Sequence, residues 1–169
     1  MDKILVSEEG YQQFYDKLNE LKKKSNLNGV SLSKSYNDYV GDGWHDNPVY
    51  EEAMRKNRMI DKDIETMIIQ SKKLKLINDA KKIGYVNIGD VLKVEFIYSL
   101  DNREEEIIKI TGKYIPNTDL DIEEITLNSP IGRAIYKEKI GNTCFYEVGE
   151  KKFSIRIVEK VNIWCLILI

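Results

Sequence analysis

The stretch GDGWHDNPVYEEA, residues 41–53, separates two long segments that both carry helical patterns. It holds two glycines, a proline, the only histidine of the chain and one of its two tryptophans. Glycine and proline are poor residues for the interior of a helix. Asn47 followed by Pro48 is typical of a helix start, because Asn caps and Pro fits the first helical position. The stretch therefore predicts a turn between two helices.

The segment before the turn has the spacing of one amphipathic helix. Ser7 suits an N-cap, and Glu8 and Glu9 suit the positive end of a helix. Apolar residues then recur every three or four positions, at Tyr11, Phe14, Leu18 and Leu21. We expect a helix from about residue 8 to about residue 39, with Gly29 as a point where it could bend.

The segment after the turn carries a heptad-like repeat. Its positions are Tyr50, Ala53, Asn57, Ile60, Ile64, Met67, Ser71 and Leu74. This spacing predicts a second helix that runs to about Asp79 and presents one seam with two polar breaks. Two helices joined by a short turn make an antiparallel coiled-coil hairpin, which we assign to residues 1–83. Each arm of about 30 residues would be ~45 Å long.

From Val86 onward the apolar period changes to two, which predicts strands. The strand-like stretches are VNIGDVLKVEFIY, EEEIIKITGKYI, DIEEITLNS, NTCFYEV and KKFSIRIVEKV. Gly149 marks a hairpin turn between the last two. The stretch NSPIGRAIYKEKIG predicts one short helix, capped by Ser129 and opened by Pro130. Residues 84–169 are therefore predicted to form a small, mostly antiparallel sheet domain, and the chain belongs to the α+β class.

Charge and cysteine content exclude several classes of protein. The formal net charge of -2 gives no bulk electrostatic case for DNA or membrane binding. Cys144 and Cys165 form no C-x-x-C pair and are expected to be reduced thiols of a cytoplasmic protein. The apolar stretch IWCLILI, residues 163–169, is shorter than the ~20 residues of a membrane span. We expect a terminal strand or packed patch there, or alternatively a self-association surface.

The hairpin, its acidic turn and the stretch ITLNSPIGRAI together resemble the bacterial transcript cleavage factors of the GreA/GreB family. The resemblance covers nearly the whole chain. The C-terminal part looks like the FKBP-like domain of that family. The family tip reads G-D-x-x-E-N-x-x-Y, and this chain has Gly41 and Asp42, then Asp46, Asn47 and Tyr50.

The resemblance implies an accessory factor rather than an enzyme. Such factors bind bacterial RNA polymerase, insert the hairpin through the secondary channel and stimulate cleavage of backtracked RNA near its 3′ end. By position, Asp42 and Asp46 match the tip acids that help to hold Mg²⁺ of the polymerase active centre. No cofactor of its own is expected, and neither is a membrane or sequence-specific DNA partner. DNA binding without sequence specificity is expected from the resemblance to transcription factors.

Each tip residue also has a simpler interpretation. Asp42 and Asp46 could serve turn chemistry alone, since Asp is common in turns. His45 is a solvated loop histidine or a phosphate contact, and a single His makes a poor metal site. Trp44 either faces RNA or polymerase, or folds back on the hairpin. Asn47 is assigned with Trp44 and His45 to the partner-facing tip.

Arg55, Lys56 and Arg58 follow the tip and are candidates for guiding the RNA 3′ end, although a solvated helix face would look the same. The tip departs from the family pattern, with Asp in place of Glu and one extra residue between the acids. A Gre-like inhibitor or regulator of polymerase without cleavage activity is therefore the alternative function. A third alternative, from another class, is a coiled-coil adaptor whose polar breaks at Asn57 and Ser71 specify a partner helix.

Overall fold

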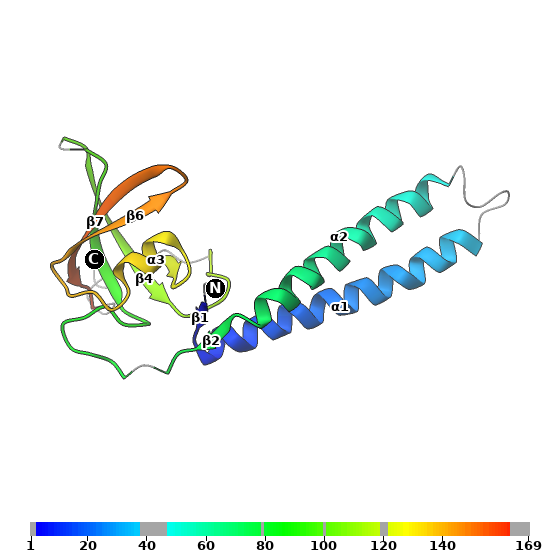
Figure 1. Ribbon diagram of the computed structural model, residues 1–169, viewed down its shortest axis with the longest axis horizontal. Coiled ribbons are helices and arrows are strands. Elements are labelled where there is room, and N and C mark those ends of the chain that lie inside the picture. The colour runs from blue at the N-terminus through cyan, green and yellow to red at the C-terminus, as the bar shows by residue number, and fades with distance from the viewer. Residues whose placement is uncertain (1–2, 38–46, 79, 100, 119–121, 163–169) are drawn as a thin grey trace. The chain divides into compact units, whose positions relative to one another are not determined.

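The computed structural model describes residues 3–37, 47–78, 80–99, 101–118 and 122–162. By its contacts the chain divides into two compact units (Figure 1). Residues 14–74 form the hairpin unit, and residues 3–13 together with 75–169 form the sheet unit. The domain boundary placed between residues 83 and 84 stays a prediction. Each unit is described by itself.

The first predicted helix is confirmed as α1, Glu8–Asn37, which continues through Gly29. Its N-cap is also confirmed. The hydroxyl oxygen of Ser7 accepts a hydrogen bond from the Gly10 amide at 3.2 Å, and the Ser7 carbonyl accepts one from the Tyr11 amide at 2.8 Å. Glu8 and Glu9 occupy the first turn, where carboxylates complement the positive helix end.

The second helix, α2, spans Pro48–Ser71 and ends earlier than the predicted Asp79. The next residues form a strand instead, β2 (Leu74–Leu76), which pairs with β1 (Ile4–Val6). The Ile77 amide donates to the Val6 carbonyl at 2.9 Å. The prediction was wrong because the apolar spacing that favoured a longer helix carries no information about this distant strand partner.

The hairpin unit buries one narrow seam, as the heptad spacing predicts. Within α2 every predicted seam position is buried or half-buried, and Met67 is the most buried of them. On α1 the matching positions are Phe14, Leu18, Leu21, Ser25, Asn28 and Leu32. Large apolar side chains on the other faces, such as Leu27 and Met59, are mainly exposed. The two helices therefore bury only one row of side chains between them.

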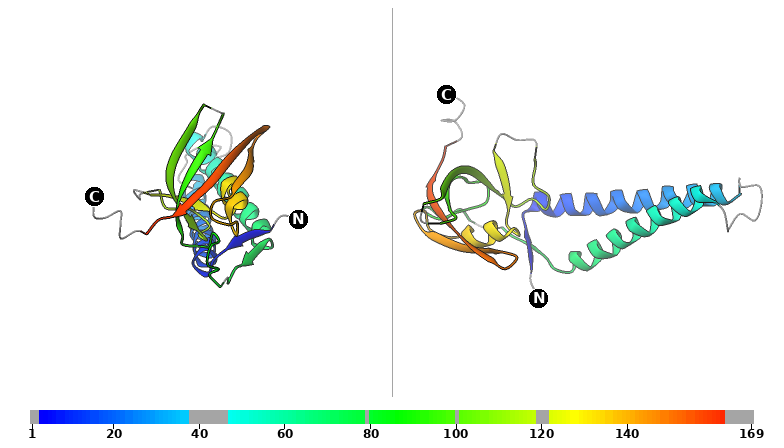
Figure 2. Two further views of the ribbon diagram at one scale, coloured as in Figure 1. Left: turned by 90° about the vertical axis from the view of Figure 1, so that its left-hand side faces the viewer. Right: turned by 90° about the horizontal axis from the view of Figure 1, so that it is seen from above.

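The sheet unit contains a five-stranded sheet in the order β5-β4-β3-β7-β6 (Figure 1). Its strands are β3 (Val91–Ile97), β4 (Arg103–Thr111), β5 (Glu123–Thr126), β6 (Thr143–Val148) and β7 (Lys151–Lys160). Gly149, with φ 63°, lies in the tight turn between β6 and β7 as predicted. Figure 2 shows the strands curled around the short helix.

The expected antiparallel pattern holds for β3–β4, β3–β7 and β6–β7, but β4 and β5 run parallel. A parallel pair needs a long connection so that the chain can return before the next strand. Residues 112–122 provide that connection here. The sheet is therefore mixed, and the likeness to FKBP-like domains stays a prediction.

Helix α3 (Pro130–Ile135) packs on the inner face of this sheet, and between them lies the apolar core. The fully buried residues include Leu92, Ile108, Leu127, Ile135 and Ile155. Ser129 caps α3 as predicted, accepting from the Gly132 amide at 3.0 Å. A side chain at Gly132 would overlap the carbonyl oxygen of Thr126, so α3 can approach the end of β5 only with glycine there.

The N-terminal segment of the sheet unit is bound to the sheet by an amide side chain. Asn128 accepts from the Leu5 amide and donates to the Leu5 carbonyl, each at 2.9 Å. The Ser7 amide donates to the Gly112 carbonyl at 2.9 Å. Gly10 lies so close to Gly112 that a Cβ atom would not fit. These contacts fix the first turn of α1 against the sheet.

A buried carboxylate stabilises the connection after β4. The side chain of Glu124 is fully buried and accepts from Lys109 at 2.9 Å, from Lys113 at 3.3 Å and from the Asn117 amide at 2.9 Å. Burial acts to raise the pKa of Glu124, but these donors together outweigh it and the pKa is lowered. Glu124 therefore stabilises the fold as a charged group.

Within the described residues, no helix is long and apolar enough to cross a membrane. The apolar stretch 163–169, and with it the expected terminal strand, lies outside the described residues.

Replacing Gly132 by alanine should lower the free energy of unfolding by about 1–3 kcal/mol, because the new methyl group meets backbone. The matched change Gly29→Ala should instead raise it by about 0.5–1 kcal/mol, since nothing lies near that site and alanine favours a helix. Urea unfolding of the full chain measures both. Equal effects of the two substitutions would contradict the predicted close approach.

Replacing Glu124 by glutamine should cost about 1–3 kcal/mol of unfolding free energy at neutral pH. Because the folded pKa is lowered, the contribution of Glu124 is complete above the ordinary carboxyl pKa and is lost as the pH falls through the folded value. The difference from the wild type should therefore shrink in acid. The neighbouring exposed Glu123→Gln is the control and should change stability little. A pH-independent difference would refute the ionic role.

Candidate functional site

The predicted tip lies between the end of α1 at Asn37 and the start of α2 at Pro48. The proposed metal-handling residues Asp42 and Asp46 lie outside the described residues, as do Trp44 and His45. Their roles stay predictions. The structure does describe the base of the tip, which decides how the chain enters α2.

Asn47 starts α2 by capping it. Its side-chain oxygen accepts from the Tyr50 amide at 3.0 Å, and its carbonyl accepts from the Glu51 amide at 3.0 Å. Asn47 is only 3% exposed, and Pro48 takes the first helical position. The capping role expected from the sequence is confirmed, whereas its partner-facing role stays a prediction. Asp46 is the residue directly before this fixed point in the sequence.

An aromatic pair holds the two helices together below the tip. The rings of Tyr36 on α1 and Tyr50 on α2 lie 5.9 Å apart, centre to centre, at an angle of 55°. Such tilted contacts stabilise a helix pair beyond the apolar area that they bury. The sequence did not single out Tyr36 for this contact, although its helical spacing from Leu32 places both on one side of α1.

The first turns of α2 carry acids and bases with different degrees of pairing. Glu52 forms an ion pair with Lys56 at 2.7 Å, and this hydrogen bond lowers the pKa of Glu52. Glu51 and Arg55 form no ion pair with any described residue, although both line one open hollow of about 300 Å³ with Pro48 and Glu52. Lys56 is therefore ion-paired, whereas Arg55 forms no ion pair with a described residue, although its charge also lowers the pKa of Glu52.

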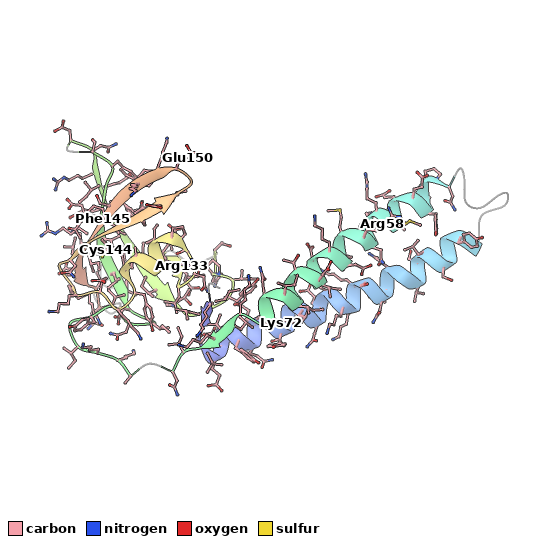
Figure 3. The ribbon with its side chains drawn as sticks, viewed as in Figure 1. Arg58, Lys72, Arg133, Cys144, Phe145 and Glu150 are labelled. Carbon is pink, nitrogen blue, oxygen red and sulfur yellow. The ribbon has the colours of Figure 1, made fainter. Side chains whose placement is uncertain are left out.

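Arg58 lies one turn further along α2 and is exposed (Figure 3). One guanidinium nitrogen lies 3.2 Å from the sulfur of Met54, which is a weak acceptor. No described carboxylate pairs with Arg58. Helical spacing places Arg55, Arg58 and Lys62 on one exposed face together with Glu51, and none of the three bases forms an ion pair with a described residue.

A polar layer interrupts the apolar seam between the helices. The Ser25 hydroxyl donates to Asp61 at 2.7 Å, and the Asn57 amide donates to the same carboxylate at 3.0 Å. The Asn57 side-chain oxygen is buried and has no hydrogen-bond partner among the described residues. The predicted polar break at Asn57 thus binds Asp61 within α2, and Asp61 in turn accepts the interhelical hydrogen bond from Ser25. A separate partner helix at that position stays a prediction.

In the sheet unit, the stretch Asn128–Arg133 serves the fold at nearly every position. Asn128 holds β1, Ser129 caps α3 and Gly132 permits close packing, whereas Arg133 points to the exposed side of α3 (Figure 3). The described residues contain no group of three or more His, Cys, Asp or Glu side chains that could hold a metal ion.

Comparison with curated proteins relates the chain to one family over nearly its full length. It is 23% identical over 164 residues to the transcription elongation factor GreA of Chlorobium phaeobacteroides, covering 94% of this chain and 96% of that protein. It is 26% identical over 160 residues to GreA of Thermoanaerobacter pseudethanolicus, covering 92% and 96%. The resemblance to the GreA/GreB family is confirmed.

No family model matches the GreA-like chain. Among solved structures it is similar to the GreA factor homolog 1 (Gfh1) protein of Thermus thermophilus, with 15% identity, a TM-score of 0.40 and coverage of 95% and 99%. It is also similar to the elongation factor GreA/GreB from Nitrosomonas europaea, with 14% identity, a TM-score of 0.35 and coverage of 66% and 93%. The resemblance to the family rests on the sequence relatives rather than on these structural scores.

Replacing Asn47 by alanine should destabilise the start of α2 by about 1 kcal/mol, because the Tyr50 amide loses its acceptor. Thermal unfolding followed by far-UV circular dichroism measures the loss. Asn26→Ala is the matched control, since Asn26 is exposed within α1 and should tolerate alanine or gain slightly from it. Equal melting temperatures for both variants would rule out the cap.

Proposed function

We propose that this chain is a transcription elongation factor that binds bacterial RNA polymerase and stimulates cleavage of backtracked RNA. The observation that carries the proposal is the combination of a capped two-helix hairpin, an acidic stretch between its helices and GreA relatives that align over 94% of the chain. In this proposal the protein acts in the cytoplasm and contacts the nascent RNA 3′ end. It is an accessory to the polymerase and not an enzyme itself.

The chemistry assigned to the tip needs only oxygen ligands. Asp42 and Asp46 offer carboxylates, which suit a hard cation such as Mg²⁺. When bound at the polymerase active centre, the ion supplies charge stabilisation for phosphodiester hydrolysis. The part left to this chain is to present the two carboxylates. The Asn47 cap supports that part, because it fixes the backbone immediately after Asp46.

The unpaired bases of α2 support an RNA-guiding role. Arg55 and Arg58 form no ion pair with described carboxylates, and both are exposed near the tip. A guanidinium group binds phosphate oxygens in a forked geometry that lysine cannot supply. Lys56 contributes less in this proposal, since Glu52 already neutralises it. The contact would weaken as the salt concentration rises.

The altered tip favours a second candidate function, inhibition of polymerase without cleavage. Asp46 replaces the Glu of the family pattern and is one methylene shorter, and one extra residue separates the two acids. Metal sites tolerate only small displacements of their ligands. An inhibitor would use the same hairpin to occupy the polymerase channel while leaving the RNA intact.

A cleavage assay on a purified, stalled and backtracked elongation complex separates the two functions. For a cleavage factor, RNA labelled at its 5′ end should shorten when the protein is added. Asp42→Asn and Asp46→Asn should each reduce the rate by about 10–100-fold, because an amide is a poorer metal ligand. Binding of the polymerase should not change.

Glu51→Gln is the matched control, since Glu51 is an acid in the first turn of α2 that forms no ion pair with a described residue and is not one of the two tip acids. It should leave cleavage close to that of the wild type. Normal cleavage by both Asp variants would refute the metal role. Intact RNA with slowed elongation would instead establish the inhibitor.

A further inference from the structure

The inner face of the sheet extends beyond the area that α3 covers. Residues directly opposite each other on paired strands point to the same face. Val94 and Phe96 of β3 are buried on the inner face, and they pair with Glu106 and Glu104 of β4. Both of these glutamates are exposed. Two acids thus lie on the face that elsewhere forms the core.

A row of aromatic rings lies on the same face. Tyr98 stacks on Phe96 with ring centres 6.2 Å apart, and it contacts Phe153 of β7 edge to face at 6.2 Å. Phe153 stacks in turn on Tyr146 of β6 at 5.5 Å. Tyr146 is buried, whereas Tyr98 is 46% exposed. The row therefore runs from the core to a ring that is open to solvent.

The two acids lie close to these rings. The pKa of Tyr98 is raised by burial first, and then by the charges of Glu104 and Glu106. The pKa of Tyr146 is raised by burial and, to a smaller extent, by Tyr98 and Glu106. The rings and the carboxylates therefore belong to one surface, which we call the aromatic–acidic face and define as Tyr98, Glu104, Glu106, Tyr146 and Phe153.

The charges on this face are not neutralised within the described part of the chain. Glu104 and Glu106 form no ion pair or hydrogen bond with described residues, whereas Glu105 between them points to the opposite face and pairs with Lys93 at 2.8 Å. Lys151 lies on the inner face by strand alternation but forms no ion pair with a described carboxylate. The outer face is balanced, and the inner one is negative.

Carboxylates beside an exposed ring form a site for a cationic side chain. A guanidinium or ammonium group can form a cation–π contact with the ring face and an ionic contact with the carboxylates at the same time. A phosphate backbone would be repelled by the same charges. The charge therefore selects a basic protein segment over nucleic acid as the occupant.

We propose that the aromatic–acidic face binds an arginine- or lysine-bearing segment of a protein partner. The bound side chain lies against the ring of Tyr98, and Glu104 and Glu106 accept its hydrogen bonds. The inference does not rest on the proposed function, because it uses residues of the sheet unit alone.

The test uses the full chain and a short peptide that contains arginine, with a peptide of the same length that carries neutral citrulline in its place. Nuclear magnetic resonance titration should show the signals of Tyr98 and of the β4 residues shifting with the arginine peptide only. Glu106→Gln should weaken binding by about three- to tenfold. The matched control is Glu105→Gln, which removes the same negative charge from the adjacent residue on the opposite face of the sheet. It should weaken binding of the arginine peptide by less than about twofold.

Two ring variants test the aromatic part. Tyr98→Phe keeps the ring and should bind like the wild type, whereas Tyr98→Leu keeps an apolar side chain and should lose about threefold or more in affinity. Equal losses for Glu105→Gln and Glu106→Gln would overturn the proposal, because binding would then follow net charge alone. Binding of the citrulline peptide, or shifts confined to other surfaces, would overturn it as well.

Discussion

The attachment of the N-terminal segment to the sheet is the constraint on which the rest of the described structure depends. Asn128 bonds both polar groups of the Leu5 backbone. A Cβ atom at Gly10 would overlap the Gly112 backbone, and one at Gly112 would overlap Ser7. The backbone bond from Ser7 to Gly112 then fixes the residue that caps α1. The same segment supplies β1, whose pairing with β2 ends the helical run after Ser71. A few contacts between residues far apart in the sequence thus determine where α1 begins and where α2 ends.

The hairpin itself is held by modest interactions. Its seam is narrow, and a polar layer of Ser25, Asn57 and Asp61 replaces apolar contacts in its middle. An unpaired buried oxygen at Asn57 costs stability that a fully apolar seam would not lose. In return, the interhelical hydrogen bond from Ser25 to Asp61 favours one register over others, as polar residues do in coiled coils. Register matters here because the cap at Asn47 and the Tyr36–Tyr50 contact both lie at the tip end.

Some charged side chains of the described residues form ion pairs within the chain, whereas others have no such partner and can bind a ligand. Glu124, Glu105 and Glu52 each have a lysine partner, and the first of them is buried. Arg55 on α2 and Glu106 on β4 have none among the described residues. A solvated charge without a partner costs the protein little stability, because surface ion pairs contribute little in water, and it can bind a group of opposite charge. The two unpaired sets have opposite signs, so they suit different ligands, phosphate on α2 and a cationic side chain on the sheet.

The sequence by itself determined the local elements, because their signals are local. The cap at Ser7, the Asn47–Pro48 start, the α3 start at Ser129 and the period-two strands all follow from neighbouring residues, and the structure confirms them. The candidate site residues of the tip were also proposed from sequence and resemblance, and Asp42 and Asp46 stay predictions. The aromatic–acidic face was not predicted from the sequence, because strand pairing brings its residues together.

The tertiary structure alone decided the features that depend on distant partners. β2 replaced the end of the predicted helix because Val6 and its strand were available to pair with it, which no window around Leu74 could reveal. β5 runs parallel to β4 because the connection between them is long enough to return. Glu104 and Glu106 share a face with Tyr98 because register joins residues that lie apart in the chain. Propensity and spacing act over a few residues, whereas pairing and burial act between segments that only the folded chain brings together.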